Sequence, residues 1–337
     1  MFGFYRLAAA VPKLKVADAA FNTEELRRCF RQAAENGADA VVFPELCVTG
    51  YSCGDLFFQE RLLAAAEAAA VDFAARTAGS RTVAVIGLPF RRGDVLFNAA
   101  AVAADGAIRG IVPKCVLPNY REFYEKRHFH SGRGITDATA CIGGREVPFG
   151  ADLIFDGGAG FRFGIEICED LWCVLPPSLY LALGGARAVF NLSAGNELAG
   201  KADYRRELVT QQSARCLAAY VLAGAGVHES TTDLVFGGHA IIADNGRLAA
   251  ENRRFDRESS LTYADVDFER LGAARLSESS FNDNPLPEGM CFRRIRLPEA
   301  AGSPDLRHAS IPRHPFVPEN AAGRRERCRE DNLGNHP

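Results

Sequence analysis

The stretch FRFGIEICEDLW, residues 161–172, decides the fold of this chain. Aromatic and β-branched residues dominate its first half, and pairs of glycine and proline lie beyond its two ends. It therefore predicts a buried strand over 161–167 that stops at Cys168. A free thiol in such a place is usually a small core residue, and the carboxylates beside it would raise its pKa. A catalytic role for Cys168 requires a base to take its proton and a cation to offset the charge.

Two other predicted strands end beside candidates for these partners. Residues 40–43 form a short apolar strand that leads through a proline into Glu45, and residues 107–112 form another that leads through a proline into Lys114. In layered α/β proteins, functional residues gather at the carboxyl ends of strands. The sequence thus predicts a site made of Glu45, Lys114 and Cys168.

The motifs around these residues resemble those of the nitrilase, or carbon–nitrogen hydrolase, superfamily. They are FPEL at 43–46, PKCVLPNY at 113–120 and EICEDLW at 166–172. The resemblance implies an α/β fold, a four-layer α–β–β–α sandwich. It also implies that Glu45 is the base, Lys114 the oxyanion stabiliser and Cys168 the nucleophile that forms a thioester. Glu125 matches a second glutamate that supports the lysine and the substrate.

Longer motifs resemble one branch of that superfamily, the glutaminase domain of glutamine-dependent NAD⁺ synthetase. They are MFGFYR at 1–6, GYSCGDLF at 50–57, LPNYREFYEKR at 117–127, QQSARC at 211–216 and ESTTDLVF at 229–236. The resemblance runs to about residue 328. It implies that glutamine is the substrate and that the released ammonia passes to an ATP-dependent synthetase domain, which amidates nicotinate adenine dinucleotide.

Residues 1–281 are predicted to form the nitrilase-like glutamine amidohydrolase domain. Residues 282–337, rich in proline and charge, are predicted to form a mobile arm toward a synthetase domain. The pyrophosphate loop of that domain has no counterpart in the sequence, so we expect no NAD⁺ synthesis by this chain alone. ATP and magnesium would belong to the synthetase domain, and no cofactor is expected here. The expected partners are a synthetase domain or subunit and further copies of the chain.

The substrate pocket is the least specific part of this prediction. The predicted substrate-binding residues are Tyr51, Tyr120, Glu169, Trp172 and Lys201. The two tyrosines could wall an amide pocket or pack as ordinary aromatic side chains near turns, whereas Lys201 matches a basic ligand-binding position of the resembled family. That family commonly has a serine where this chain has Gly195, which helps to bind the glutamine backbone, so the resemblance is incomplete here.

Composition excludes several classes of function. The chain has 337 residues, 47% of them hydrophobic, and a formal net charge of −3, which gives no sign of a nucleic-acid or membrane partner. No signal sequence and no apolar run of about 18 residues is visible, so a cytoplasmic protein is expected. Ten cysteines occur without a C-x-x-C pair, which predicts reduced residues rather than a metal site.

The periodicity predicts strands arranged both in hairpins and between helices, which is typical of a mixed sheet. Asn22 is the predicted N-cap of a helix to residue 36, and a second helix is predicted over 57–76. Hairpins are predicted around Asp105-Gly106 and Asn245-Gly246.

Three alternatives stay open. The pattern GYSCG at 50–54 fits a G-x-S-x-G elbow, which would make Ser52 a nucleophile served by His228 or His239. A member of the superfamily could instead be a free-standing amidase that acts on another small amide. The chain could also be an inactive truncated fragment that requires a synthetase partner.

Overall fold

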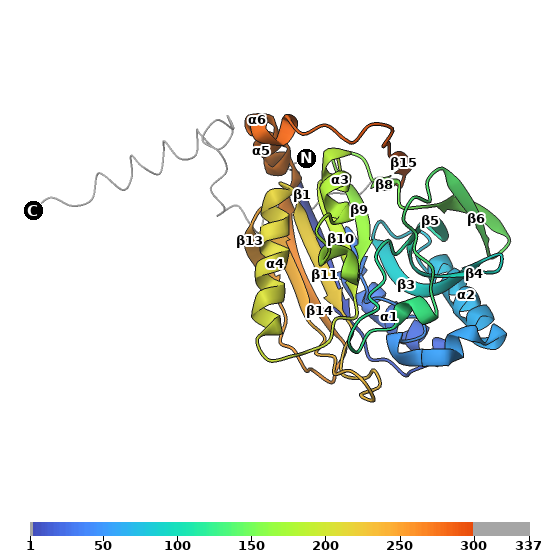
Figure 1. Ribbon diagram of the computed structural model, residues 1–337. Coiled ribbons are helices and arrows are strands. Elements are labelled where there is room, and N and C mark those ends of the chain that lie inside the picture. The colour runs from blue at the N-terminus through green and yellow to red at the C-terminus, as the bar shows by residue number, and fades with distance from the viewer. Residues whose placement is uncertain (1–2, 299–337) are drawn as a thin grey trace, which may run out of the picture. The chain divides into compact units, whose positions relative to one another are not determined.

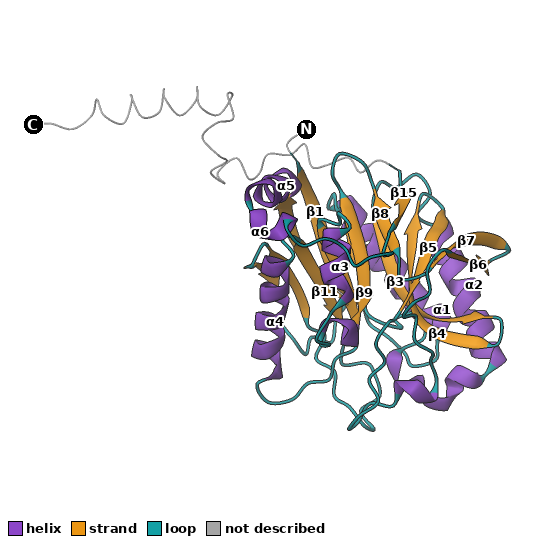
Figure 2. Ribbon diagram, turned by 45° about the horizontal axis from the view of Figure 1, so that its top comes forward, coloured by secondary structure: helices purple, strands orange, loops and turns teal. Residues whose placement is uncertain are grey.

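The computed structural model describes residues 3–298, in which two mixed β-sheets pack face to face (Figures 1 and 2). The first sheet contains, in spatial order, β14 (Ser260–Asp267), β1 (Phe4–Val11), β2 (Ala40–Val42), β3 (Val83–Arg92), β4 (Val95–Ala104), β5 (Ala107–Pro113), β7 (Arg145–Phe149) and β6 (Ala138–Ile142). The second contains β13 (Arg247–Glu251), β12 (Ala240–Asp244), β11 (Ala219–Gly224), β10 (Ala188–Ser193), β9 (Arg162–Ile167), β8 (Leu153–Asp156) and β15 (Arg293–Arg296).

Helices cover the outer face of each sheet. On the first sheet lie α1 (Ala19–Glu35) and α2 (Glu60–Ala75), and on the second lie α3 (Pro177–Leu183) and α4 (Lys201–Arg215). The remaining helices are α5 (Phe268–Ser277), α6 (Ser279–Asn282) and the short 3₁₀ segments η1 (Tyr51–Phe58), η2 (Glu125–Arg127) and η3 (Cys168–Leu171). The order of layers is therefore α–β–β–α, which confirms the predicted four-layer sandwich. No helix within residues 3–298 is long and apolar enough to cross a bilayer.

The central core lies between the two sheets. Because successive strand residues point to opposite faces, each strand sends alternate side chains into it. These inward side chains include Leu7, Val42 and Val85 from the first sheet and Ile165, Phe190 and Val221 from the second. The helices bury the other faces, so the middle strands are apolar on both sides, and this explains their continuous hydrophobic runs.

Parallel pairing brings the predicted site residues to one edge of the sandwich. In the first sheet β2 lies parallel to β1 and β3, and in the second β10 lies parallel to β9 and β11. Glu45 follows β2, Lys114 follows β5 and Cys168 follows β9. Each sheet thus contributes part of the site through the loops that leave its strands.

The predicted N-cap of the first helix was wrong. The N-cap of α1 is Asp18, whose carboxylate accepts the Phe21 N–H. Asn22 lies inside the helix with its side chain buried, where it bonds the backbone of Lys15 and Val48. Asn22 therefore connects the loop before the helix to the turn after Glu45. Because asparagine is also a common N-cap residue, the sequence suggested a cap at this position.

Several elements were not predicted, namely the strands β6, β7 and β15 and the helices α5 and α6. The hairpin of β6 and β7 turns at Gly143 and Gly144, both with positive φ, and extends the first sheet. The strand β15 pairs in parallel with β8, and its Arg293 bonds Asp152 at 2.7 and 2.8 Å. The sheet therefore continues beyond the boundary expected at residue 281. Of the predicted arm, residues 299–337 lie outside the described residues.

Glu45 lies in a tight turn that crosses directly over β3. Leu46 in this turn has φ of 52°, and Val48 N–H donates to the carbonyl of Gly87 at 3.1 Å. A Cβ at Gly87 would lie 2.3 Å from the Leu46 nitrogen and 2.6 Å from the Pro44 oxygen. The absence of a side chain on Gly87 is what allows this turn to approach the strand.

Gly87→Ala should therefore displace the turn that holds Glu45. We expect the free energy of unfolding to fall by about 1–3 kcal/mol, because the clashing atoms belong to backbone and cannot rotate away. Thermal and denaturant unfolding measure this. Gly195→Ala is the matched control, since its Cβ would meet no atom nearer than 3.5 Å. Equal stability of the two variants would contradict the packing argument.

Candidate active site

Lys114 is fully buried between two carboxylates. Its Nζ lies 2.6 Å from Glu45 Oε1 and 2.7 Å from Glu125 Oε1. Burial alone would lower the pKa of Lys114, but the attraction of Glu125 and Glu45 outweighs it and raises that pKa well above its ordinary value. Burial also raises the pKa of Glu125 to about 7, against the opposing effect of Lys114. The lysine is therefore a fixed cation.

Two polar side chains hold this ion triplet in place. Asn98, in the middle of β4, donates to Glu45 Oε1 at 2.6 Å and to Glu125 Oε2 at 3.4 Å. The hydroxyl of Tyr51 donates to Glu125 Oε1 at 2.9 Å. Asn98 was not predicted, although an asparagine within the apolar run of β4 is a signal, because a buried amide needs a partner.

Cys168 begins the 3₁₀ segment η3 with φ of 46°, and its side chain is buried. Burial raises the pKa of its thiol to about 12; the charge of Glu45 adds to this effect and that of Lys114 opposes it. The Ser193 hydroxyl donates to Sγ at 3.4 Å. Glu45 Oε2 is buried and has no hydrogen-bond partner among the described residues, which leaves an acceptor for a proton.

Asp170 joins the loop of Lys114 to the loop of Cys168. Its Oδ2 accepts the Ile167 N–H at 2.8 Å, while its Oδ1 accepts the N–H groups of Cys115 at 3.1 Å and Val116 at 2.7 Å. Burial raises the pKa of Asp170 to about 7, although the bond from Ile167 lowers it. Asp170 therefore crosslinks the ends of β5 and β9, which belong to different sheets.

A cavity of about 470 Å³ opens beside Cys168, within the usual size range of small-molecule sites. Four of the five predicted substrate-binding residues line it: Tyr120, Glu169, Trp172 and Lys201. We call it the Cys168 cavity. The Tyr120 hydroxyl donates to Glu169 at 2.8 Å, and the ammonium of Lys201 lies 5.2 Å from the centre of the Trp172 ring. Lys201 also bonds Asn196, which in turn bonds Glu122.

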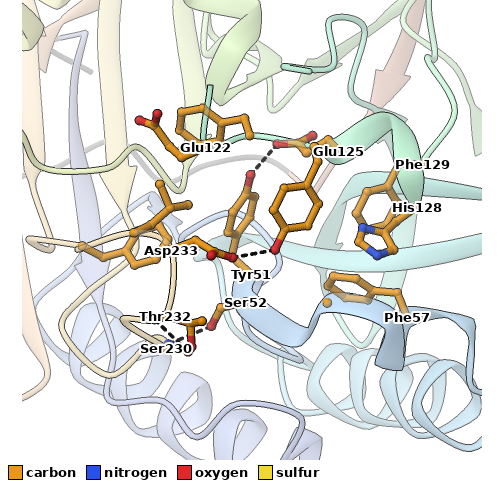
Figure 3. A pocket seen from close by; sticks show the side chains of 15 residues that line it. Tyr51, Ser52, Phe57, Glu122, Glu125, His128, Phe129, Ser230, Thr232 and Asp233 are labelled. Carbon is orange, nitrogen blue, oxygen red and sulfur yellow. Dashed lines mark hydrogen bonds between the residues drawn. The ribbon is translucent and has the colours of Figure 1, made fainter. Parts of the chain in front are cut away.

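Tyr51 lines a separate cavity of about 240 Å³, shown in Figure 3. We call it the Tyr51 cavity. Glu125 lines it as well, so the carboxylate that holds Lys114 faces this second space. Glu122 and Phe123 line both cavities. Tyr51 therefore supports Glu125, and it does not line the Cys168 cavity.

The hydrogen bonds of Ser52 do not fit those of an activated nucleophile. Its Oγ donates to Glu229 Oε2 at 2.5 Å and accepts the Ser230 N–H at 2.8 Å. His228 bonds a backbone oxygen of Arg257, and His239 lies between Arg205 and Glu251. Neither histidine hydrogen-bonds Ser52 within the described chain. Ser52 instead helps to anchor the start of η1 on the loop that follows β11.

The described cysteines are all unpaired. Within residues 3–298, no group of three or more His, Cys, Asp or Glu side chains is placed to hold a metal ion.

The carbon–nitrogen hydrolase family matches residues 6–276. A glutamine-dependent NAD(+) synthetase of Mycobacterium tuberculosis is 42% identical over an alignment of 337 residues. The alignment covers 97% of this chain and 49% of that protein. The chain thus spans about half the length of the relatives it matches. A solved glutamine-dependent NAD(+) synthetase from Cytophaga hutchinsonii has a TM-score of 0.71 at 28% identity, covering 78% of this chain and 43% of that one.

An amidase from Nesterenkonia has a TM-score of 0.61 at 20% identity, covering 82% of this chain and 95% of that one, and it shows the fold alone. The family match extends over most of the described residues and includes all three strand ends at the site. The chain belongs to the carbon–nitrogen hydrolase family.

Proposed function

We propose that this chain hydrolyses the side-chain amide of glutamine at Cys168 and releases ammonia. The observation that carries the proposal is the charge distribution of the Cys168 cavity, which presents Lys201 and Glu169 together with the thiol. Glutamine carries a carboxylate that Lys201 can bind and an ammonium that Glu169 can bind. Its side-chain amide is then left to reach the sulfur. The relatives named above as glutamine-dependent support the same assignment.

In the first half of the reaction, Glu45 accepts the thiol proton as Sγ attacks the amide carbon. The carbonyl oxygen becomes an oxyanion, which the Lys114 ammonium stabilises with the backbone N–H of Glu169. That N–H lies in the first turn of η3, where amides have no acceptor within the helix. Glu45 returns its proton to the nitrogen, the C–N bond breaks, and ammonia leaves a thioester on Cys168.

In the second half, water attacks the thioester carbon while Glu45 again accepts a proton. The C–S bond breaks, glutamate is formed and the proton returns to the thiol. Lys114 stabilises the oxyanion of both halves, a contribution typically worth about 2.7–4 kcal/mol for one donor. Glu125 keeps the ammonium in position, and Tyr51 keeps Glu125 in position.

For the whole protein, we propose that the ammonia feeds an ATP-dependent amidation of nicotinate adenine dinucleotide. ATP and magnesium would serve that second reaction, with a synthetase domain or subunit as the partner. The support is the similarity to glutamine-dependent NAD(+) synthetases, of which this chain covers about half the length.

A second candidate is a small aliphatic amide as substrate. Gly195 favours it, because this residue lines the Cys168 cavity and has no side chain that could hydrogen-bond the backbone atoms of an amino acid substrate. The two candidates differ in the ligand and share the chemistry at Cys168.

Cys168→Ala should lower ammonia release from glutamine by at least about a thousandfold, since the variant lacks the nucleophile. A coupled ammonia assay measures this. The exposed Cys141 provides the control, and Cys141→Ala should keep wild-type turnover. If Cys168→Ala remained active and Ser52→Ala did not, the nucleophile would be Ser52 and the proposal would fall.

Glu45→Gln should prevent formation of the thioester, because an amide cannot accept the thiol proton. Intact-protein mass spectrometry after rapid mixing with glutamine detects the glutamyl adduct directly. We expect the adduct in wild type under quenched conditions and none in the variant. An adduct that forms as fast in Glu45→Gln as in wild type would show that another group is the base.

Gly195→Ser distinguishes the two candidate substrates. The nearest atoms to a Cβ at this position are Ser193 Oγ at 3.5 Å and Arg205 Nη2 at 3.6 Å, so a small side chain fits. A serine hydroxyl that bonds the backbone of glutamine should lower KM for glutamine about tenfold, with kcat unchanged. Steady-state kinetics with glutamine and with propionamide supply the comparison. An improvement for propionamide alone would favour the small-amide candidate.

A further inference from the structure

The backbone of Cys168 is held in an uncommon conformation. With φ of 46° the residue lies in the left-handed region, which disfavours any residue with a side chain. Its N–H donates to Oδ1 of Asn191 at 3.2 Å. The direction in which Sγ and the following N–H point depends on this conformation, so the partner of the Cys168 N–H acts on the geometry of the proposed reaction.

The orientation of the Asn191 amide is determined by its surroundings. A backbone N–H can only donate, so the atom of Asn191 that faces Cys168 is the oxygen. The amide nitrogen then faces Tyr220, and it donates to the Tyr220 hydroxyl at 2.9 Å. Because Tyr220 accepts this bond, its own hydrogen is free to be donated elsewhere.

Glu166 accepts the hydrogen bond from this hydroxyl. The Tyr220 hydroxyl donates to Glu166 Oε1 in a short contact, and Glu166 Oε2 accepts the Ser178 N–H at 2.8 Å. Burial raises the pKa of Tyr220 well above its ordinary value, so the phenol keeps its proton. A chain of bonds with one direction therefore runs from Cys168 N–H through Asn191 and Tyr220 to Glu166.

This chain of hydrogen bonds runs across three neighbouring strands. Glu166 lies on β9, Asn191 on β10 and Tyr220 on β11, and the register of β10 places Asn191 opposite Glu166. Their exposed fractions are 1%, 0% and 0%. None of the three lines the Cys168 cavity or the Tyr51 cavity. They cannot touch a substrate, so an effect on the reaction must pass through Cys168.

We propose that Glu166, Tyr220 and Asn191 are positioning residues that hold Cys168 in its reactive conformation through this directed chain. The expected effect on kcat rests on the proposed function, whereas the expected effect on the reactivity of the Cys168 thiol does not depend on glutamine. Ser193, two residues beyond Asn191 on the same face of β10, bonds Sγ itself. One strand thus fixes both the backbone and the sulfur of Cys168.

Tyr220→Phe tests the chain with the loss of one oxygen atom. Without the hydroxyl, the Asn191 nitrogen loses its bond to Tyr220, and the amide loses a contact that orients it. We expect kcat with glutamine to fall about tenfold while KM stays within about twofold, because no ligand contact changes. Tyr263→Phe is the matched control, since it removes a buried tyrosine hydroxyl from β14 in the other sheet.

The second measurement reports on the thiol without turnover. We expect iodoacetamide to reach and alkylate Cys168 through the Cys168 cavity, and peptide mapping by mass spectrometry separates this site from the other cysteines. The alkylation rate constant of Cys168 should fall about tenfold in Tyr220→Phe and stay within about twofold in Tyr263→Phe. If wild type hydrolyses no glutamine but this difference is found, the proposed substrate is wrong and the positioning chain stands.

Glu166→Gln provides the variant of nearly equal size in case Tyr220→Phe does not fold. Both oxygens of Glu166 accept hydrogen bonds, so a glutamine must turn its NH₂ group toward a donor, either Tyr220 or Ser178. We expect the same fall in alkylation rate and in kcat. Wild-type values of both in the folded variants, with only the melting temperature lowered, would show that the chain is structural and would overturn the inference.

Discussion

The constraint on which the rest of the structure depends is the burial of the Lys114 ammonium between two carboxylates. A buried charge is tolerated only when it is paired and hydrogen-bonded, and the removal of one partner typically costs about 3–5 kcal/mol. Glu45, Glu125 and Asn98 come from different segments; the two carboxylates bond the Lys114 ammonium, and Asn98 bonds both carboxylates. The requirement of one cation therefore determines how the loops of the first sheet meet.

The second sheet supplies the thiol, and the site forms where loops from the two sheets meet. Glu45 and Lys114 leave strands of the first sheet, and Cys168 leaves β9 of the second. The apolar core between the sheets fixes the distance between these groups, because close-packed interiors resist small displacements. The packing of the core therefore also determines the geometry of the site. The position of the Lys114 ammonium relative to the Cys168 sulfur depends on Asn98 and Asp170, which line neither the Cys168 cavity nor the Tyr51 cavity.

Much of this could be predicted from the sequence, for reasons that are local. Strand ends, the turns at Asp105-Gly106 and Asn245-Gly246, and the motifs around Glu45, Lys114 and Cys168 depend on neighbours in the chain. Glu125 was predicted as a supporting residue, but Asn98, Asp170 and Asn191 were not, because they find their partners through the packing of segments far apart in sequence. The short, arginine-rich β15 has no apolar run to reveal it, since it pairs at a sheet edge.

Asp170 has a consequence for how the protein can deform. Stacked sheets can slide slightly over one another, and such shear would change the separation of a thiol carried by one sheet and an ammonium carried by the other. Asp170 bonds the backbone beside Lys114 and the backbone beside Cys168 at the same time. The two segments are therefore joined to each other by Asp170 as well as through their own sheets, where the Lys114 N–H bonds Asn98 and Ile167 lies within β9. Any sliding of the sheets that changed the separation between the Cys168 sulfur and the Lys114 ammonium would have to strain the bonds of Asp170.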